Sequence, residues 1–157
     1  MIESALREIS PGASLAGPVP WPALGQLFGA FAGIAGIGLA KMTKALHPKR
    51  SALIPMLDSI VQAYLRDDDP GVQAPFAGRA LGLVRGYQHD LDANLTALRA
   101  ARAQLAAHGH RLTEVRILDL LILSARPTSR PAAKSAGPAA RGASPAAKSA
   151  GPAATAR

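Results

Sequence analysis

GIGLAKMTKAL, at residues 36–46, is the stretch of this sequence that decides the fold. A Gly-hydrophobic-Gly turn lets two short helices reverse tightly, because glycine adopts positive φ without a Cβ penalty. Residues 39–46 are predicted to form a helix whose first amide groups have no acceptor inside that helix. These amides and the positive end of the helix dipole form a potential phosphate site. The stretch therefore predicts sequence-independent binding of a nucleic-acid backbone.

The remainder of residues 1–125 predicts further helices and no strand pair, so the expected fold class is all-α. Helices are expected over residues 1–8, 22–32, 39–46, 59–65, 76–107 and 114–124. Asp58 and Thr113 precede two of them at positions typical of N-caps. Three glycines (Gly78, Gly82 and Gly86) are expected to interrupt the helix over 76–107.

The last two predicted helices differ in what the sequence indicates about them: where the first ends, and which face of the second is buried. Gly109 is expected to end the helix over 76–107. The final helix is expected to bury one face, which comprises Val115, Leu118, Leu121 and Ile122.

Residues 9–40 carry no charged side chain, which raises the question of a membrane span within residues 19–40. Pro18, Pro20 and Pro22 interrupt the start of this stretch, and its many glycines make transfer into lipid less favourable. No basic segment of a signal peptide precedes it. We therefore interpret the stretch as a buried core helix followed by the turn, with no membrane contact, and keep the span as the alternative.

Most of the net charge of +8 belongs to the C-terminal tail. Residues 126–157 carry six Lys and Arg side chains and no acidic ones, so residues 1–125 hold 12 basic and 10 acidic side chains. Residues 131–140 recur unchanged at 145–154. A repeat without large apolar side chains cannot offset its chain entropy, which predicts a disordered tail beginning at residue 126. This tail either contacts nucleic acid or acts as a spacer.

A second basic cluster surrounds the predicted turn. Lys41 and Lys44 lie three residues apart on one helical face, and Lys49 and Arg50 continue the cluster beyond it. These side chains either bind phosphates or are solvated, and Lys49 and Arg50 have the further option of pairing with the Asp67–Asp69 loop. That aspartate loop is predicted to be a solvated turn, because it lacks the ligand spacing of a calcium site.

The sequence contains no motif that indicates binding of a metal or a cofactor. It contains no cysteine, and its four histidines show no ligand spacing. We expect neither a metal nor a cofactor, and the absence of thiols fits a cytoplasmic protein. The oligomeric state is left open.

Several of these residues carry a family resemblance. The set comprises Gly36-Ile37-Gly38, Lys44, Leu46, Lys49-Arg50, Leu53, Pro55, Asp58 and the segment at 112–119. Over about residues 20–125 the chain resembles an uncharacterised bacterial family catalogued as domain of unknown function 6308. The resemblance implies a fold and no established activity.

The same region is distantly similar to the helix-hairpin-helix DNA glycosylases. In that family a Gly-hydrophobic-Gly hairpin is followed about twenty residues later by an aspartate that supports base excision, and Asp58 stands at that place. Ala40 stands where lyase-type members carry a lysine, so the resemblance does not imply Schiff-base chemistry. The residue-based alternative for Asp58 is a helix N-cap.

Three functions follow as hypotheses. The first is non-catalytic binding of DNA or another nucleic acid through Gly36, Gly38, Lys41, Lys44, Lys49 and Arg50. The second is a structural or protein-interaction module with a degenerate glycosylase-like core. The third is a monofunctional base-excision enzyme that uses Asp58.

Overall fold

The computed structural model describes residues 1–125, and this part of the chain contains helices and turns but no strand. The all-α prediction is therefore confirmed for these residues. Residues 126–157, to which the prediction of disorder applies, lie outside the described part. The helices are α1 (Ile2–Arg7), α2 (Trp21–Gly29), α3 (Leu39–Leu46), α4 (Ser59–Tyr64), α5 (Phe76–Ala93), α6 (Leu95–Ala107) and α7 (Glu114–Ser124), with 3-10 turns η1 (His47–Lys49) and η2 (Arg66–Asp68).

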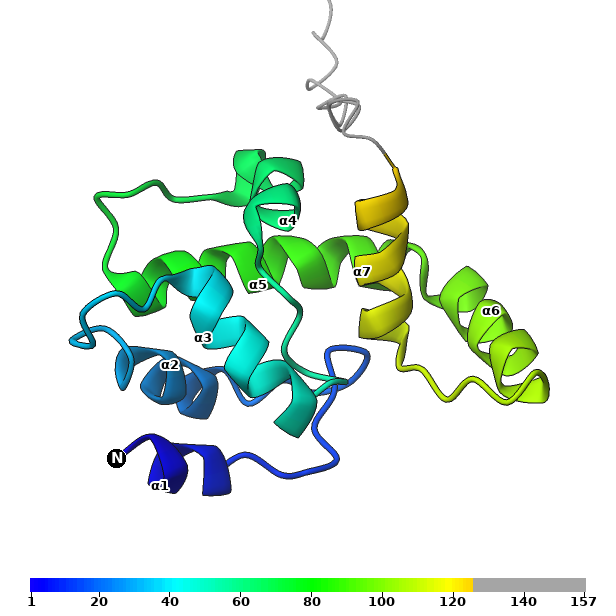
Figure 1. Ribbon diagram of the computed structural model, residues 1–157, viewed down its shortest axis with the longest axis horizontal. Helices are drawn as coiled ribbons and strands as arrows, with labels where there is room; N and C mark the ends of the chain where they lie inside the picture. The colour runs from blue at the N-terminus through cyan, green and yellow to red at the C-terminus, as the bar shows by residue number, and fades with distance from the viewer. Residues whose placement is uncertain (126–157) are drawn as a thin grey trace, which may run out of the picture.

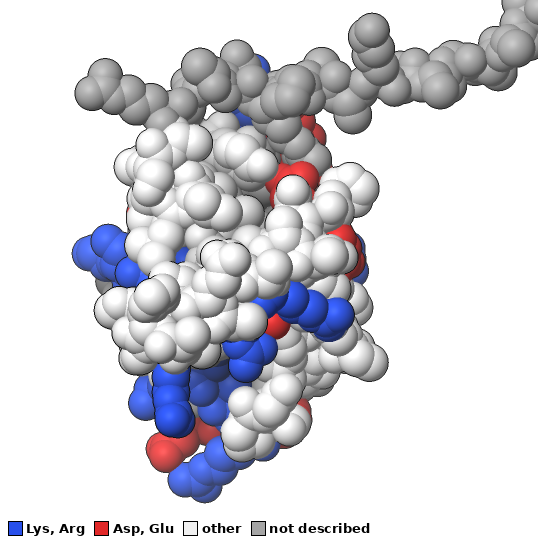
Figure 2. Space-filling view, turned by 90° about the vertical axis from the view of Figure 1, so that its right-hand side faces the viewer, with Lys and Arg blue, Asp and Glu red and all other residues white. Residues whose placement is uncertain are grey.

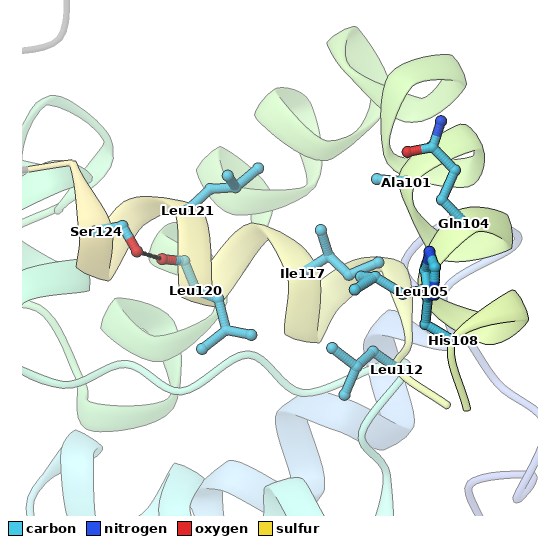
Figure 3. Close-up of a pocket in the computed structure, with 9 residues that line it drawn as sticks. All are labelled: Ala101, Gln104, Leu105, His108, Leu112, Ile117, Leu120, Leu121 and Ser124. Atoms are coloured by element: carbon cyan, nitrogen blue, oxygen red, sulfur yellow. Dashed lines mark hydrogen bonds between the residues drawn. The ribbon is translucent and has the colours of Figure 1, made fainter. Parts of the chain in front are cut away.

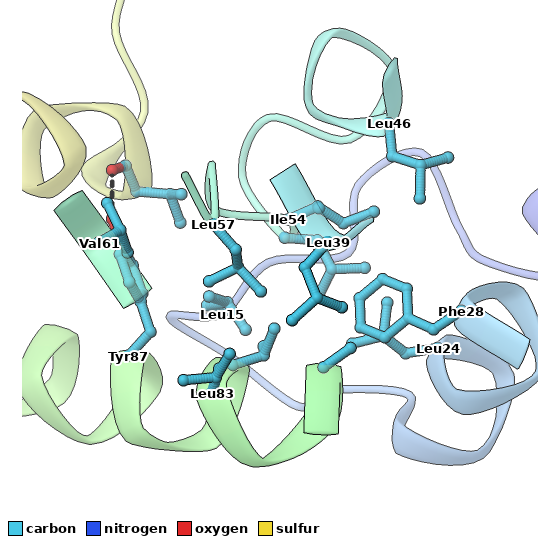
Figure 4. Packing of buried hydrophobic residues seen from close by; sticks show 14 of the residues in the cluster. Leu15, Leu24, Phe28, Leu39, Leu46, Ile54, Leu57, Val61, Leu83 and Tyr87 are labelled. Atoms are coloured by element: carbon cyan, nitrogen blue, oxygen red, sulfur yellow. Dashed lines mark hydrogen bonds between the residues drawn. The ribbon is translucent and has the colours of Figure 1, made fainter. Parts of the chain in front are cut away.

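Helix α5 is the central element of the fold (Figure 1). Helix α2 packs against α5, α7 contacts α4, α5 and α6, and α6 projects to one side with α7 as its main neighbour. The buried side chains form one core, in which α2, α3, α5 and the segment 53–57 meet (Figure 4). The predicted buried helix after Pro22 is confirmed, because α2 buries Leu24, Leu27 and Phe28. Within residues 1–125, no helix has the length and apolar character needed to cross a membrane.

Local capping residues fix where three of these helices begin or end. The Asp58 side chain accepts hydrogen bonds from the amides of Ile60 and Val61, both at 3.0 Å, and so caps α4 as predicted. Thr113 caps α7 by accepting the Arg116 amide at 3.1 Å. Gly109 follows α6 with a φ of +84°, the left-handed conformation that favours glycine after a helix.

The glycines of α5 do not interrupt it, so that prediction was wrong. The chain breaks instead at Asn94, between α5 and α6. Gly82 and Gly86 have a packing role, because a Cβ at Gly86 would lie 2.4 Å from Cγ of Asp68. A Cβ at Gly82 would lie 2.8 Å from Cδ of Pro70. The aspartate loop thus rests directly on the backbone of α5, where only glycine leaves enough room.

The aspartate loop differs from the solvated turn that was predicted. Asp69 forms an ion pair with Arg79 of α5, with Nη2 of Arg79 2.7 Å from Oδ2 and Nε 2.9 Å from Oδ1. This hydrogen-bonded pair lowers the pKa of Asp69. The alternative in which Lys49 and Arg50 pair with this loop is wrong for residues 1–125, because neither side chain forms an ion pair there and the Arg50 guanidinium contacts backbone carbonyls.

The buried face of α7 also differs from the prediction at one position. Val115, Leu118 and Ile122 are buried as expected, whereas Leu121 is 55% exposed. The fully buried residue on the inner face is Asp119, a carboxylate within an apolar run. The tertiary contacts of Asp119, described below, explain how the core accommodates it.

Candidate nucleic-acid interface

Residues 30–38 connect α2 to α3, and this connection is longer than the tight reversal predicted from the glycines. Gly36 has a φ of +75°, which a residue with a side chain rarely adopts. Gly38 is extended, with a φ of −98°, and acts as the N-cap of α3 without any side-chain cap. Both glycines are exposed, and a Cβ on either would meet no heavy atom of the described residues within 4 Å beyond its chain neighbours. The approach to this turn is therefore open.

The first turn of α3 carries amides that no protein group caps. The Met42 amide is the first to find an acceptor, the carbonyl of Gly38 at 3.0 Å. Within residues 1–125, the amides of Leu39, Ala40 and Lys41 have no such acceptor. Uncapped amides at an exposed helix start are able to donate to an anion from solvent.

Of the lysines predicted for the site, Lys41 and Lys44 lie near this turn and Lys49 lies beyond the other end of α3. The Lys41 ammonium donates to the Gly36 carbonyl at 2.9 Å, which holds its charge over the turn. Lys44 is exposed one helical turn further along α3, and Lys49 is exposed at the end of η1. In the part of the chain that the structure describes, none of the three lysines forms an ion pair with a carboxylate.

Arg50 lies apart from these lysines and has a structural role. Its Nη2 donates to the carbonyls of Leu6 and Ile9 at 3.0 and 2.9 Å, and its Nη1 donates to the Lys49 carbonyl at 2.7 Å. These bonds fasten the N-terminal segment to the end of η1. His47 is fixed in a similar way, because its Nδ1 lies 2.7 Å from the Ile54 carbonyl. The structure thus places Lys41 and Lys44 with the glycine turn and directs Arg50 toward α1.

Asp58 is joined to α3 through the segment that precedes it. The Thr43 hydroxyl of α3 donates to the Leu39 carbonyl at 2.9 Å and accepts the Leu57 amide at 3.0 Å. Asp58 itself is half-buried, and its Oδ1 accepts both of the capping amides of α4. The helix-cap interpretation of Asp58 is confirmed, and a catalytic role stays a hypothesis.

A buried network holds the same segment from the opposite side. Asp119 Oδ2 accepts the Met56 amide at 3.4 Å, and Asp119 Oδ1 lies 3.1 Å from the Tyr87 hydroxyl. That hydroxyl also lies 2.7 Å from the Val115 carbonyl, although it has only one proton to donate. A protonated Asp119 resolves this shortage, because it can donate to Tyr87 while Tyr87 donates to Val115.

The electrostatic surroundings of Asp119 favour this protonated state below about pH 6. Burial raises the pKa of Asp119 to about 6, although the Tyr87 hydrogen bond and the charges of His47 and Arg116 act in the opposite direction. Burial, with the nearby Asp119 charge, also raises the pKa of Tyr87 well above its ordinary value. Sequence reasoning missed this network, and its available signal was the single carboxylate in the run Ile117-Leu118-Asp119-Leu120-Leu121-Ile122.

A separate concave surface lies between α6 and α7 (Figure 3). Leu105, Leu112 and Ile117 meet at its centre, and Leu120 and Leu121 extend it along α7. Among the described residues that line it, His108 is the one titratable group. Figure 2 shows this side of the molecule, where a broad uncharged area lies above a group of Lys and Arg side chains. The α6–α7 surface therefore lacks the charge that phosphate binding requires. Among residues 1–125, no three His, Asp or Glu side chains come together as a potential metal site.

These features define a small all-α domain with an exposed, basic glycine turn. The model of a family of unknown function (DUF6308) matches residues 1–125, and the chain belongs to this family. The match includes residues 1–19, which the sequence resemblance left out, and this extension agrees with the Arg50 bonds to the N-terminal segment. Neither a comparison with curated proteins nor one with solved structures gave a match.

Proposed function

We propose that the domain binds nucleic acid through its phosphates, without reading base sequence and without catalysis, by means of a helix-hairpin-helix-like element formed by α2, the Gly36–Gly38 turn and α3. The observation that carries this proposal is an open helix start next to exposed lysines in a region free of carboxylates. Residues 9–57 contain four Lys and Arg side chains and no Asp or Glu. An anion that approaches α3 therefore meets attraction from its own segment and no competing carboxylate there.

Backbone and side-chain donors have complementary parts in this proposal. The turn at Gly36 and Gly38 exposes the first amides of α3, which orient one phosphate by direct hydrogen bonds. Lys41 and Lys44 supply charge to that phosphate and to the next one, and Lys49 extends the attraction toward η1. Because these contacts involve phosphate oxygens only, they fix the position of the backbone and leave the bases unread.

A second candidate function follows from the link between Asp58 and α3. The Thr43–Leu57 hydrogen bond ties the segment before Asp58 to the hairpin helix. Because of this connection, a phosphate bound at α3 would hold a duplex near the Asp58 carboxylate. That proximity favours the base-excision hypothesis. An assay for base release that compares wild type with Asp58→Asn tests this candidate separately.

The binding proposal is tested by salt titration of the full chain against a fluorescent 20-base-pair duplex. Log affinity is expected to fall linearly with log salt, with a slope of about 0.9 for each neutralised phosphate. The double variant Lys41→Glu/Lys44→Glu is expected to lower the slope by about two units and the affinity by roughly a hundredfold. Two duplexes of unrelated sequence are expected to bind equally.

The matched control is Arg99→Glu/Arg111→Glu, which changes the net charge by the same amount at exposed positions on α6 and the loop after it. Both double variants keep the tail, so the difference between them reports the hairpin alone. Equal losses of duplex affinity in the two double variants would show that overall charge, and not the hairpin, accounts for the effect. If neither variant alters binding, or if the full chain binds no duplex at low salt, the protein-interaction module becomes the better account.

A further inference from the structure

We infer that a groove between α1 and the C-terminal end of α3 is a binding site for a small amphipathic anion, a molecule with an apolar body and one anionic head group. The groove has a volume of about 490 Å³. This volume lies in the range of about 300–1,000 Å³ that is usual for small-molecule sites. The site shares Lys49 with the proposed nucleic-acid interface, but the inference does not depend on that proposed function.

The floor and one wall of the groove are apolar. Phe31 and Leu46 are core residues, 8% and 2% exposed, and they form part of the lining. Ile2 and Leu6 of α1 contribute half-buried apolar surface beside them. An alkyl or aryl group placed here would leave water for contact with these side chains, which is favourable in proportion to the apolar area buried.

The polar part of the groove is positively charged. Within residues 1–125, its lining includes Arg7, Lys49 and Arg50 as cations and Glu3 as the one carboxylate. Glu3 already pairs with Arg7 at 3.0 Å, so the charges of Lys49 and Arg50 are left without a balancing carboxylate among the described residues. The groove thus combines apolar contact with two unbalanced positive charges.

Arg50 gives the stronger argument for an anion, because its position is fixed and its charge is half-buried. Its guanidinium is held by the carbonyls of Leu6, Ile9 and Lys49, which leaves it little freedom to follow a ligand or to move into solvent. Its Nε is buried without a hydrogen-bond partner among residues 1–125. A half-buried charge that meets only neutral dipoles gains from an anion nearby, because its field is screened less there than in bulk water.

The dipole of α3 acts against an anion at this end of the helix. Its C-terminal end corresponds to about half a negative charge. The two positive charges of Lys49 and Arg50 exceed this, so the net field in the groove still favours an anion. The phosphate site proposed above lies at the opposite end of α3, roughly 12 Å away along an eight-residue helix.

Titration of the ¹⁵N-labelled full chain with decanoate, below its micelle-forming concentration, tests the site by NMR. Decanoate is expected to shift the amide resonances around Leu6, Phe31 and Leu46 in a saturable way. Acetate has the head group without the apolar body, and decyltrimethylammonium has the same apolar chain with the opposite charge. Both are expected to bind at least tenfold more weakly. Equal binding of the cationic compound, or decanoate shifts centred on another surface, would overturn the proposal.

Two pairs of variants locate the binding within the molecule. Ala45→Trp places an indole over the groove, whereas Ala63→Trp places the same side chain on the exposed face of α4. Lys49→Glu reverses a charge in the groove, whereas Lys41→Glu reverses one at the other end of α3. The first member of each pair is expected to weaken decanoate binding about tenfold, and the second to leave it unchanged. Equal effects within the pairs would refute the assignment to this groove. Lys49→Glu alters an exposed side chain, so its result stands even where Ala45→Trp disturbs the fold.

Discussion

The charged side chains of residues 9–57 and those of residues 58–125 differ in sign and in how many of them are paired. The first region holds four Lys and Arg and no carboxylate, whereas the second holds seven Arg and eight Asp and Glu. In the second region Asp69 pairs with Arg79, Glu114 pairs with Arg102, and Asp119 is buried in a hydrogen-bonded network. In the first region the lysines are exposed and form no ion pair within residues 1–125.

This difference separates charge that stabilises the fold from charge that is free to attract a partner. A near-neutral domain can still present a strongly basic surface when its carboxylates are concentrated in another region. Changes to the paired or buried charged residues after Asp58, such as Asp69, Arg79 and Asp119, are therefore expected to alter the free energy of unfolding. Changes to the lysines of α3 are expected to alter binding and leave stability almost unchanged.

The largest expected effect concerns Asp119 and depends on pH. Its pKa is about 6 in the folded protein against an ordinary value of 3.8, so the folded state holds this proton more tightly than the unfolded state. The contribution to stability is complete below about pH 4 and is lost as pH rises through about 6. This amounts to about 3 kcal/mol. In denaturant titrations from pH 4 to 7.5, Asp119→Asn is expected to gain that amount relative to wild type as pH rises. A constant difference between the two proteins would show that Asp119 does not take up a proton on folding.

Breaking the Asp69–Arg79 pair is the next largest change. Arg79→Ala removes its three hydrogen bonds to Asp69 and leaves a mostly buried carboxylate without its ion-pair partner, which is expected to cost about 2 kcal/mol. The lowered pKa of Asp69 gives this contribution the opposite pH dependence to that of Asp119, since it is lost as pH falls through the folded-state pKa. Arg99→Ala at an exposed position is the control and is expected to cost less than about 0.5 kcal/mol. Equal costs in denaturant titrations would contradict the comparison.

Asp58 has an intermediate expected effect on stability. Asp58→Ala removes the cap of α4 and is expected to cost about 1 kcal/mol, whereas Asp58→Asn keeps a capping oxygen and is expected to cost much less. Thermal unfolding measures both. The same pair tests the base-excision candidate by assays for base release from duplex DNA. Activity that wild type shows and Asp58→Asn lacks would assign the carboxylate a catalytic role beyond capping.

The smallest expected effect on stability is that of removing residues 127–157. This segment contains no large apolar side chain, so the melting temperature is expected to stay within about 1 °C. The truncation removes five of the six tail charges and is expected to weaken duplex binding while preserving its dependence on Lys41 and Lys44. A large drop in melting temperature would mean that the tail packs on the domain, and an unchanged affinity would identify it as a spacer.

Much of the fold could be predicted because its signals act over a few residues. The caps at Asp58 and Thr113 and the positive φ of Gly36 and Gly109 involve only neighbouring backbone, so composition and spacing indicate them correctly. The roles of Gly82 and Gly86 could not be predicted in the same way. These glycines leave room for the loop around Asp68 and Pro70, which packs against α5. The spacing of residues within α5 does not indicate that tertiary contact.

For the candidate site too, the features that depend on local sequence could be predicted, whereas those that depend on tertiary contacts could not. The sequence by itself determined that the domain is all-α, that a glycine turn precedes α3, and that residues 9–57 carry only positive charge. Only the tertiary structure decided which of those charges face solvent. Lys44 and Arg50 belong to one basic run, yet Arg50 bonds to carbonyls more than 40 residues earlier in the chain and Lys44 remains exposed. The reason is that the partner of a long side chain depends on which distant backbone groups the fold brings within about 3 Å, and local sequence does not specify that distance.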